Sequence, residues 1–440
     1  MNQSNDKPNS AAGDLRRDFL KTAAASAVIA GFPAILKGQS VTNAIKIGLV
    51  GCGGRGTGAA AQALQADDYG TLTAMADVFQ ERIDDSLENL GRARKGILAD
   101  RLKVEKQSQF TGLDAYDKLI NSGVDVVLLA TPPGFRSLHL DACIRAGKHV
   151  FCEKPVAVDA FGVRQVLATV DAAKQKNLSL VAGFCWRYDQ KIKATFEQIS
   201  NGAIGDILNY YATYYTNPVK PMPPASTRPA GMSDVEWQIR NWYNFTWLCG
   251  DSLVEQAVHS VDKVAWAMKD QPPVSCVAVG GRQIPAEGGN IFDHFSVNYL
   301  YPKDVRAVVA NRQIEGCYNE NADYIMGTKG ICTIGRGQMP RITGETKWTY
   351  EKQGNEIDMY QVEHNALFAS IRQGKPINDG VRMTTSTLLA LMGRMAAYTG
   401  QTITWDQAMN SQERLVPEKL DWTMSLPVAA MARPGLTKFI

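Results

Sequence analysis

Short apolar runs alternate with segments of helical pattern between residues 45 and 152. The runs are rich in Ile, Val, Leu and Ala, which is typical of strands buried on both faces of a parallel sheet. They are residues 45–50, 71–76, 124–130 and 148–152. This alternation predicts right-handed βαβ units, whose ligands bind beyond the carboxyl ends of the strands.

The pattern changes after Gly183, where longer runs alternate apolar and polar residues in several places. Such alternation predicts strands with one buried face. The runs are residues 207–216, 274–280, 294–301 and 305–314. Because no helical crossover separates the last two, and Tyr-Pro-Lys-Asp at 301–304 has turn character, we expect a mostly antiparallel sheet.

A glycine-rich segment, Gly51-Cys52-Gly53-Gly54-Arg55-Gly56, joins the first run to the first helical segment. Glycines at this position supply a tight turn and let the backbone approach a pyrophosphate, while the start of the helix attracts the anion. We therefore predict cofactor contacts from Gly51, Gly53, Gly54, Arg55 and Gly56.

The second run ends at Asp77, 21 residues after Gly56. An acid at this place is expected to bond the adenosine ribose hydroxyls and to repel a 2′-phosphate. This favours NAD as cofactor, while Arg82 nearby leaves NADP open. A cap at the end of a strand is the structural alternative for Asp77.

These patterns predict an α/β Rossmann dinucleotide-binding domain at 42–165 and an α+β domain with a large, mostly antiparallel open sheet at 166–400. The second domain would bind substrate and other subunits, and 401–440 would form a C-terminal tail. Segments 363–373 and 384–398 are expected to be helices that pack back on the first domain.

Residues 1–41 have the pattern of an export signal. Arg16 and Arg17 are followed by Phe19, Leu20 and Lys21, and a mildly apolar stretch covers 22–36. Twin arginines before such a stretch direct export of folded proteins, so we expect a periplasmic protein. The stretch is too short to span a bilayer. Because no free dinucleotide pool exists outside the cytoplasm, the cofactor should be tightly bound. A tail that contains two arginines by chance is the alternative.

Composition narrows the partners. The chain has 440 residues, of which 45% are apolar and 21% charged, and a net charge of only +3. Nucleic-acid binding is not expected, because it usually requires a basic excess on the folded domain. The eight cysteines contain no Cys-x-x-Cys, so we predict no metal site and interpret them as small buried apolar residues.

Three segments carry a resemblance to a known family. They are Ala130-Thr131-Pro132-Pro133, the segment 146–155 that ends Glu153-Lys154-Pro155, and Gly183 to Tyr188. With the glycine loop they resemble the glucose–fructose oxidoreductase and inositol dehydrogenase family (Gfo/Idh/MocA). The resemblance implies that Lys154 contacts the reacting hydroxyl beside the nicotinamide, where an ammonium can stabilise developing charge. Thr131, Pro132, Glu153 and Lys154 are accordingly expected at the cofactor.

The second motif of that family normally reads Asp-x-Gly-x-His-x-x-Asp, and this chain has Glu255-Gln256-Ala257-Val258-His259-Ser260-Val261-Asp262. The resemblance implies catalytic roles for Glu255 and His259. An acid four residues before a histidine shares its helix face, as do residues three apart, so His259 would take the hydroxyl proton while a carboxylate holds the imidazolium. Asp262 would bond a neighbouring substrate hydroxyl. Glu255 and Ala257 depart from the family pattern, and a buried structural histidine is the alternative for His259.

An insertion at 218–250 is rich in aromatic residues next to Arg and Asn. Flat apolar rings beside hydrogen-bond donors suit a sugar, so we predict substrate contacts from Arg240 and Trp242, and also from Arg187. An aromatic mini-core that anchors a long loop is the alternative.

The resulting hypothesis is an exported NAD(P)-dependent oxidoreductase that transfers a hydride at a secondary hydroxyl of a sugar, glycoside or inositol. The alternative is an NAD-dependent, redox-assisted glycoside hydrolase. A third interpretation is a dinucleotide-binding protein without catalysis. The resemblance also implies a homo-dimer or homo-tetramer, and the mature chain shows no membrane span.

Overall fold

Six parallel strands form the first sheet in the order β3-β2-β1-β4-β5-β6. The computed structural model describes residues 43–440 apart from 285–287, 336 and 353. The strands are β1 (Ile45–Val50), β2 (Gly70–Asp77), β3 (Gln109–Thr111), β4 (Val126–Leu129), β5 (His149–Cys152) and β6 (Leu180–Ala182). The chain reverses direction across the sheet between β1 and β4, where this class of sheet opens a ligand crevice.

Helices cover both faces of this sheet, because its strands are apolar on both sides. They include α2 (Gly54–Ala66), α3 (Gln80–Arg92), α4 (Ala115–Ile120), α5 (Pro133–Arg145) and α6 (Ala160–Gln175). The predicted α/β Rossmann domain is confirmed. Its sheet includes β6, which lies beyond residue 165, where we placed the domain's end; the helical pattern of α6 hides the short strand that follows it.

Nine strands form the second sheet in the order β14-β13-β12-β11-β7-β10-β9-β8-β15. All its neighbouring strands are antiparallel except β7 and β10, so the predicted mostly antiparallel sheet is confirmed. The strands are β7 (Ile207–Thr216), β8 (Ser275–Gly281), β9 (His294–Leu300), β10 (Arg306–Gln313), β11 (Glu320–Gly327), β12 (Gly330–Gly335), β13 (Gln338–Gly344), β14 (Trp348–Thr349) and β15 (Ile403–Thr404).

Two C-terminal helices connect the sheets. Helix α11 (Met359–Gln373) packs on α2, and α12 (Gly380–Thr399) lies between α6 and the second sheet with most of its side chains buried. The predicted packing of both helices on the first domain is therefore confirmed. They hold the two sheets in one compact unit of residues 42–440.

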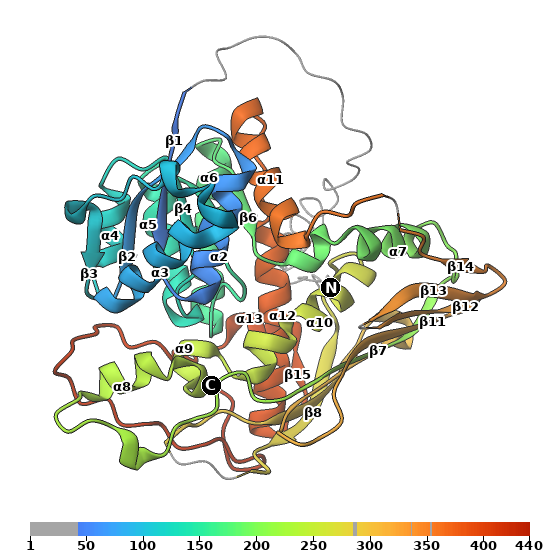
Figure 1. The fold of residues 1–440 in the computed structure, drawn as a ribbon. Helices are drawn as coiled ribbons and strands as arrows, with labels where there is room; N and C mark the ends of the chain where they lie inside the picture. Colours follow the sequence, from blue (N-terminus) through green and yellow to red (C-terminus); the bar gives the residue numbers. More distant parts are fainter. Residues whose placement is uncertain (1–42, 285–287, 336, 353) are drawn as a thin grey trace, which may run out of the picture. The chain divides into compact units, whose positions relative to one another are not determined.

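The insertion folds into short helices beyond the carboxyl ends of the first sheet's strands (Figure 1). Helix α8 (Asp234–Arg240) and helix α9 (Thr246–Cys249) share an apolar cluster with the C-terminal tail. The approach is close, since a Cβ on Gly134 at the start of α5 would lie 2.2 Å from the carbonyl oxygen of Trp247 in α9.

The export signal expected at 1–41 lies outside the described residues. Within the described ranges, none of the helices has the length and apolar character that crossing a bilayer requires.

Candidate active site

The glycine loop leaves room for a pyrophosphate at the start of α2. Gly51 has φ +92°, and a Cβ on Gly56 would lie 1.9 Å from the Gly51 carbonyl oxygen, so both positions require glycine for the turn itself. A Cβ on Gly53 or Gly54 would meet no atom within 4 Å. Because α2 starts here without a side-chain cap, its first N–H groups can bind an anion. The loop therefore fits a dinucleotide.

Asp77 ends β2 beside this loop. Its Oδ2 accepts from the Cys52 backbone N–H at 2.7 Å and its Oδ1 accepts from the Phe79 N–H at 3.1 Å. Burial raises the pKa of Asp77, although the N–H donors and the charge of Arg82 oppose the effect. Each carboxylate oxygen keeps a further lone pair, so the group can still accept from ribose hydroxyls.

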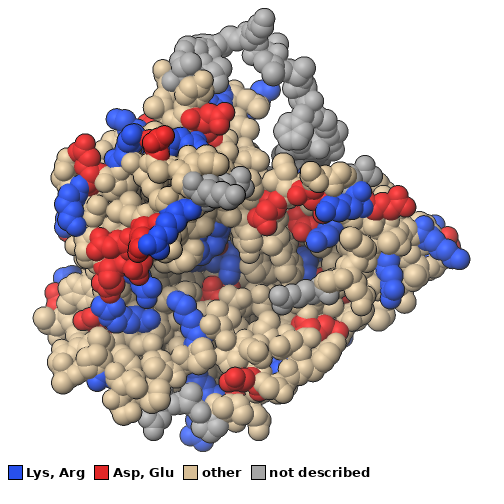
Figure 2. All heavy atoms as spheres, viewed as in Figure 1, with Lys and Arg blue, Asp and Glu red and all other residues tan. Residues whose placement is uncertain are grey.

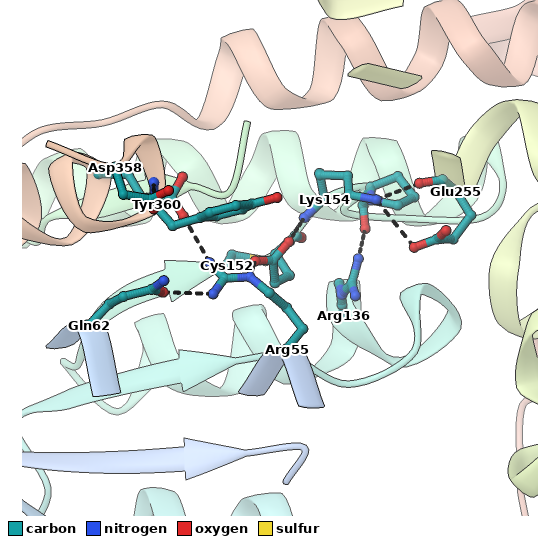
Figure 3. Close-up of polar contacts among 11 residues, drawn as sticks. Arg55, Gln62, Arg136, Cys152, Lys154, Glu255, Asp358 and Tyr360 are labelled. Atoms are coloured by element: carbon teal, nitrogen blue, oxygen red, sulfur yellow. Dashed lines mark hydrogen bonds and ion pairs between the residues drawn. The ribbon is translucent and has the colours of Figure 1, made fainter. Parts of the chain in front are cut away.

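Arg55 and Glu153 form an ion pair beneath the loop (Figure 3). Arg55 also pairs with Glu363 of α11 through Nη2 at 2.8 Å, and its guanidinium lies 4.8 Å from the Tyr360 ring centre. Burial alone would raise the pKa of Glu153, but the charges of Arg55, Arg136 and Lys154 outweigh it and lower that pKa. The structure thus uses Arg55 and Glu153 to connect the glycine loop, β5 and α11.

The loop after β4 contributes the next part of the site. Pro132 is the N-cap of α5, and the Thr131 hydroxyl lies 3.4 Å from His139 Nδ1. One turn into α5, buried Arg136 donates to the carbonyl oxygen of Pro155 at 2.8 Å and supports the segment that carries Lys154. Arg136 could not be predicted as part of the site, because a lone arginine in a helix carries no local signal.

Lys154 follows β5 at the carboxyl edge of the first sheet and is only 9% exposed. Its ammonium donates to the main-chain oxygen of Glu255 at 2.5 Å and to Glu255 Oε1 at 3.2 Å (Figure 3). Glu255 belongs to the π-helical turn η7 (Leu253–Ala257), which leads into α10 (Val258–Ala267) with His259. The structure therefore brings Lys154 and Glu255 into contact, as a shared site requires.

His259 lies against the ring of Trp186, with ring centres 5.4 Å apart and an interplanar angle of 25°. Its Nδ1 is buried, and no described residue bonds it. Burial, followed by the charges of Lys154, Lys263 and Arg55, holds the pKa of His259 well below its ordinary value. The imidazole is therefore neutral near pH 7 and can accept a proton.

Glu255 lies in the π-helical turn and His259 in the α-helix that follows it, and no hydrogen bond between the two is among the described interactions. A role for Glu255 in holding the imidazolium therefore stays a prediction. Glu255 bonds Lys154 and accepts from the Gln256 side chain at 2.6 Å.

Arg187 and Asp262, both expected to contact substrate, bind each other. Asp262 is 1% exposed and accepts from Arg187 Nε at 2.9 Å and from the Ser386 hydroxyl at 2.7 Å. Arg187 also pairs with Asp270 at 2.6 Å. The structure therefore shows these two residues as partners that support the fold between the turn after β6 and α10, and their contact with substrate stays a prediction.

Trp242 belongs to the apolar cluster of the insertion, as the structural alternative proposed, and Arg240 packs on Phe79 of the same cluster. The Arg240 guanidinium lies 3.8 Å from the Phe79 ring centre and pairs with Glu81 at 2.7 Å and with Glu236 at 2.8 Å. Phe79 and Glu81 flank the end of β2, so Arg240 lies on the Asp77 side of the crevice. Trp242 packs edge-on against Tyr243. Neither residue contacts Lys154 or Glu255 in the described interactions.

A cavity of about 330 Å³ lies next to the contact of Arg240 with Phe79 and Glu236. Its lining combines the ends of β2 and β3 with the insertion and the C-terminal tail. The residues are Val78, Phe79, Thr111, Gly112, Glu236 and Trp422. Figure 2 shows a recess between the part that holds the first sheet and the insertion lobe, with basic side chains inside it.

All eight cysteines are free, and all are buried except Cys317. In the part of the chain that the structure describes, no group of three or more His, Cys, Asp or Glu side chains is arranged to hold a metal ion.

A family profile described as an oxidoreductase family with an NAD-binding Rossmann fold (GFO_IDH_MocA) matches residues 45–184. Myo-inositol 2-dehydrogenase of Thermotoga maritima is 31% identical over 161 residues, which span 37% of this chain and 42% of that protein. Inositol 2-dehydrogenase of Rhizobium meliloti is 25% identical over 351 residues, which span 77% of this chain and 93% of that protein.

Solved structures share the fold. Aldose-aldose oxidoreductase from Caulobacter crescentus, complexed with glycerol, superposes with a TM-score of 0.63 at 19% identity and covers 82% of this chain and all of its own. Levoglucosan dehydrogenase in complex with NADH and levoglucosan gives a TM-score of 0.65 at 18% identity, covering 82% and 99% of the two chains. Residues 45–184, with the glycine loop and Asp77, therefore resemble the NAD-binding Rossmann fold of the GFO_IDH_MocA oxidoreductase profile, and the chain as a whole shares the fold of these dehydrogenase structures.

Proposed function

We propose that this chain is an NAD-dependent dehydrogenase that transfers a hydride at a secondary hydroxyl of a sugar, glycoside or inositol. The observation that carries the proposal is the buried Lys154 ammonium at the carboxyl edge of the first sheet, in contact with Glu255 from the segment that leads to His259. Relatives named as inositol and levoglucosan dehydrogenases support this class of substrate. The proposal includes export by the twin-arginine route, a periplasmic location and a tightly held cofactor.

The binding roles follow from the geometry. Gly53, Gly54 and the start of α2 would hold the pyrophosphate, and Asp77 would accept from the adenosine ribose hydroxyls. When bound, NAD supplies the hydride acceptor. We favour NAD over NADP because Asp77 would repel a 2′-phosphate.

The catalytic roles fall to two side chains. Lys154 donates a hydrogen bond to the reacting hydroxyl oxygen, where negative charge develops as the proton leaves. Neutral His259 accepts that proton. Glu255 keeps the Lys154 ammonium oriented through its main-chain oxygen and its carboxylate.

The test begins with the purified, exported protein. Its absorbance in the reduced-nicotinamide band is followed while myo-inositol, levoglucosan, free aldoses and aryl glycosides are added in turn. An absorbance change with a free polyol or sugar supports the proposal. Release of an aryl alcohol without net cofactor reduction would instead indicate the redox-assisted hydrolase. A bound cofactor that responds to none of these compounds would contradict catalysis on carbohydrate.

Export is tested separately by replacing Arg16 and Arg17 with lysine, which keeps the charge but removes the twin-arginine signal. We expect the variant to accumulate in the cytoplasm and the wild type in the periplasm. Equal periplasmic amounts of both would contradict this route.

A further inference from the structure

Trp186 contacts two side chains of helix α10. Its ring stacks on the imidazole of His259 at 5.4 Å between ring centres, and the ammonium of Lys263 lies 3.9 Å from the centre of the same indole. His259 and Lys263 are four residues apart in regular α-helix, so they lie on one face, one above the other. Trp186 follows β6 in the turn Cys185–Tyr188 and reaches this face from the first domain.

Lys263 is held in place by a buried ion pair. It is 2% exposed and bonds the Oδ2 of Asp323, which is fully buried on β11. The Oδ1 of the same carboxylate accepts from the Tyr210 hydroxyl on β7 at 3.0 Å. A lysine fixed in this way keeps its charge at one place, whereas a surface lysine samples many positions.

The charged groups around His259 come from several elements. Lys154 follows β5 and is bonded by Glu255 of η7, and Arg55 on α2 is bonded by Glu153. On the histidine's own helix lie Lys263, which is paired with Asp323 of β11, and Asp262, whose carboxylate is bonded by Arg187 and Ser386. The nearby cations Lys154, Lys263 and Arg55 disfavour protonation of His259. No described residue accepts a hydrogen bond from its buried Nδ1, so no acceptor there stabilises the imidazolium against them.

We propose that Lys263 and Trp186 are positioning residues that hold the His259 ring in place and keep it neutral, ready to accept the substrate's hydroxyl proton. Trp186 fixes the plane of the ring by stacking, and Lys263 opposes protonation before substrate arrives. This inference rests on the proposed role of His259 as the proton acceptor.

The direct test measures the protonation of His259 by NMR titration of labelled histidine side chains. The chain has five histidines, and a His259→Gln variant assigns the signal. The double variant Lys263→Met, Asp323→Asn removes the ion pair without leaving a buried charge, and asparagine keeps an oxygen for Tyr210. We expect the pKa of His259 to rise, because a cation beside the ring is lost. Lys193→Met, which removes an exposed lysine on α7 (Gln190–Ser200), should leave it unchanged. An unchanged pKa of His259 in the folded double variant would overturn the inference.

Trp186 is tested through kinetics and a conservative rescue. Trp186→Leu should lower kcat about tenfold with little change in KM, because a misoriented base fails after substrate has bound. Trp186→Phe retains a ring to stack on and should recover most of the loss. Equal kcat values for the Leu variant and wild type would contradict a positioning role.

The two proposals fail in distinguishable ways. If the double variant raises the pKa of His259 but the acid limb of the kcat/KM profile stays where it was, His259 is not the proton acceptor and the proposed mechanism fails. If His259→Gln abolishes turnover, but the pKa of His259 is the same in the double variant as in wild type, the mechanism stands and the positioning inference fails.

Discussion

The ammonium of Lys154 donates to both the main-chain oxygen and the carboxylate of Glu255, at 2.5 and 3.2 Å. These residues are 101 positions apart in sequence and belong to different parts of the fold. The contact joins the carboxyl edge of the first sheet to the helical segment of His259, near enough for the charge of Lys154 to help lower the pKa of that imidazole.

The carboxylate of Glu255 should matter through its charge. In Glu255→Gln the main-chain contact to Lys154 remains while the anion is lost, so we expect kcat to fall about tenfold with the fold intact. Steady-state kinetics with the best polyol substrate measures this. Glu255→Asp keeps the charge but shortens the side chain, so its kcat should lie between that of wild type and that of Glu255→Gln. A Gln variant as active as wild type would show that Lys154 needs only the main-chain oxygen.

Gly53 and Gly56 should separate cofactor binding from folding. Gly53 has φ −70° and open space at its Cβ, so Gly53→Val should fold, with the cofactor-free protein losing only about 1 kcal/mol for a poorer N-cap of α2. A side chain there would block the pyrophosphate, and we expect at least tenfold weaker NAD binding by calorimetry. Gly56→Ala is the matched comparison, because its methyl would collide with the Gly51 carbonyl and lower the Tm itself. Wild-type NAD affinity in Gly53→Val would show that the pyrophosphate lies elsewhere.

Arg240 should help to retain the dinucleotide. It links the insertion (218–250) to Glu81 and Phe79, next to the end of β2. Arg240→Ala should therefore loosen the packing of the insertion beside Asp77, where the adenosine ribose is expected to bind. We expect NAD to dissociate several-fold faster, measured by stopped-flow release. Arg228→Ala removes an arginine of the same insertion that pairs only within it, with Asp234 at 2.9 Å, and serves as the control. Equal release rates in the two variants would contradict a role for Arg240 in retention.

Asp251 should make stability depend on pH. It is fully buried in the turn before η7, and burial raises its pKa from 3.8 to about 6. The folded state holds the proton of Asp251 more tightly than the unfolded state does. The resulting contribution to the free energy of unfolding is therefore complete below about pH 4 and is lost as pH rises through about 6. The full effect is roughly 3 kcal/mol.

Asp251→Asn removes this titration, and Asn tolerates the residue's φ of +95°. Urea unfolding at pH 4.5 and 7.5 should show the variant gaining stability relative to wild type as pH rises. The exposed Asp304, also at positive φ, gives the control Asp304→Asn. The same pH dependence in both variants would rule out Asp251 as the source.

Local patterns predicted the strands well. Residues 45–50 and 207–216 were predicted as strands and are β1 and β7 with the same bounds. The continuous apolar run of β1 fits a strand buried on both faces, and the partial alternation of β7 fits a strand with one more exposed face. Strands β11, β12 and β13 were not predicted; they form the far side of the second sheet, where polar side chains such as those of Glu320 and Asn321 obscure the alternation.

The site was predictable only in part. The sequence pointed to Lys154 and His259 through motifs, but the partners of both come from segments far along the chain. Glu363 lies 308 residues from Arg55, and no pattern in either segment predicts that the two form an ion pair. The π-helical turn that carries Glu255 likewise has no reliable sequence signature.

The central claim, that Lys154 acts at the site of hydride transfer, is tested most directly by Lys154→Ala. The protein is purified with its bound nicotinamide, and turnover of the active polyol is compared with that of Lys148→Ala, which removes the lysine just before the same strand. We predict that the Lys154 variant keeps its cofactor and loses at least about a hundredfold in kcat, while the Lys148 variant stays near wild type. Full turnover by Lys154→Ala with cofactor bound would contradict the claim.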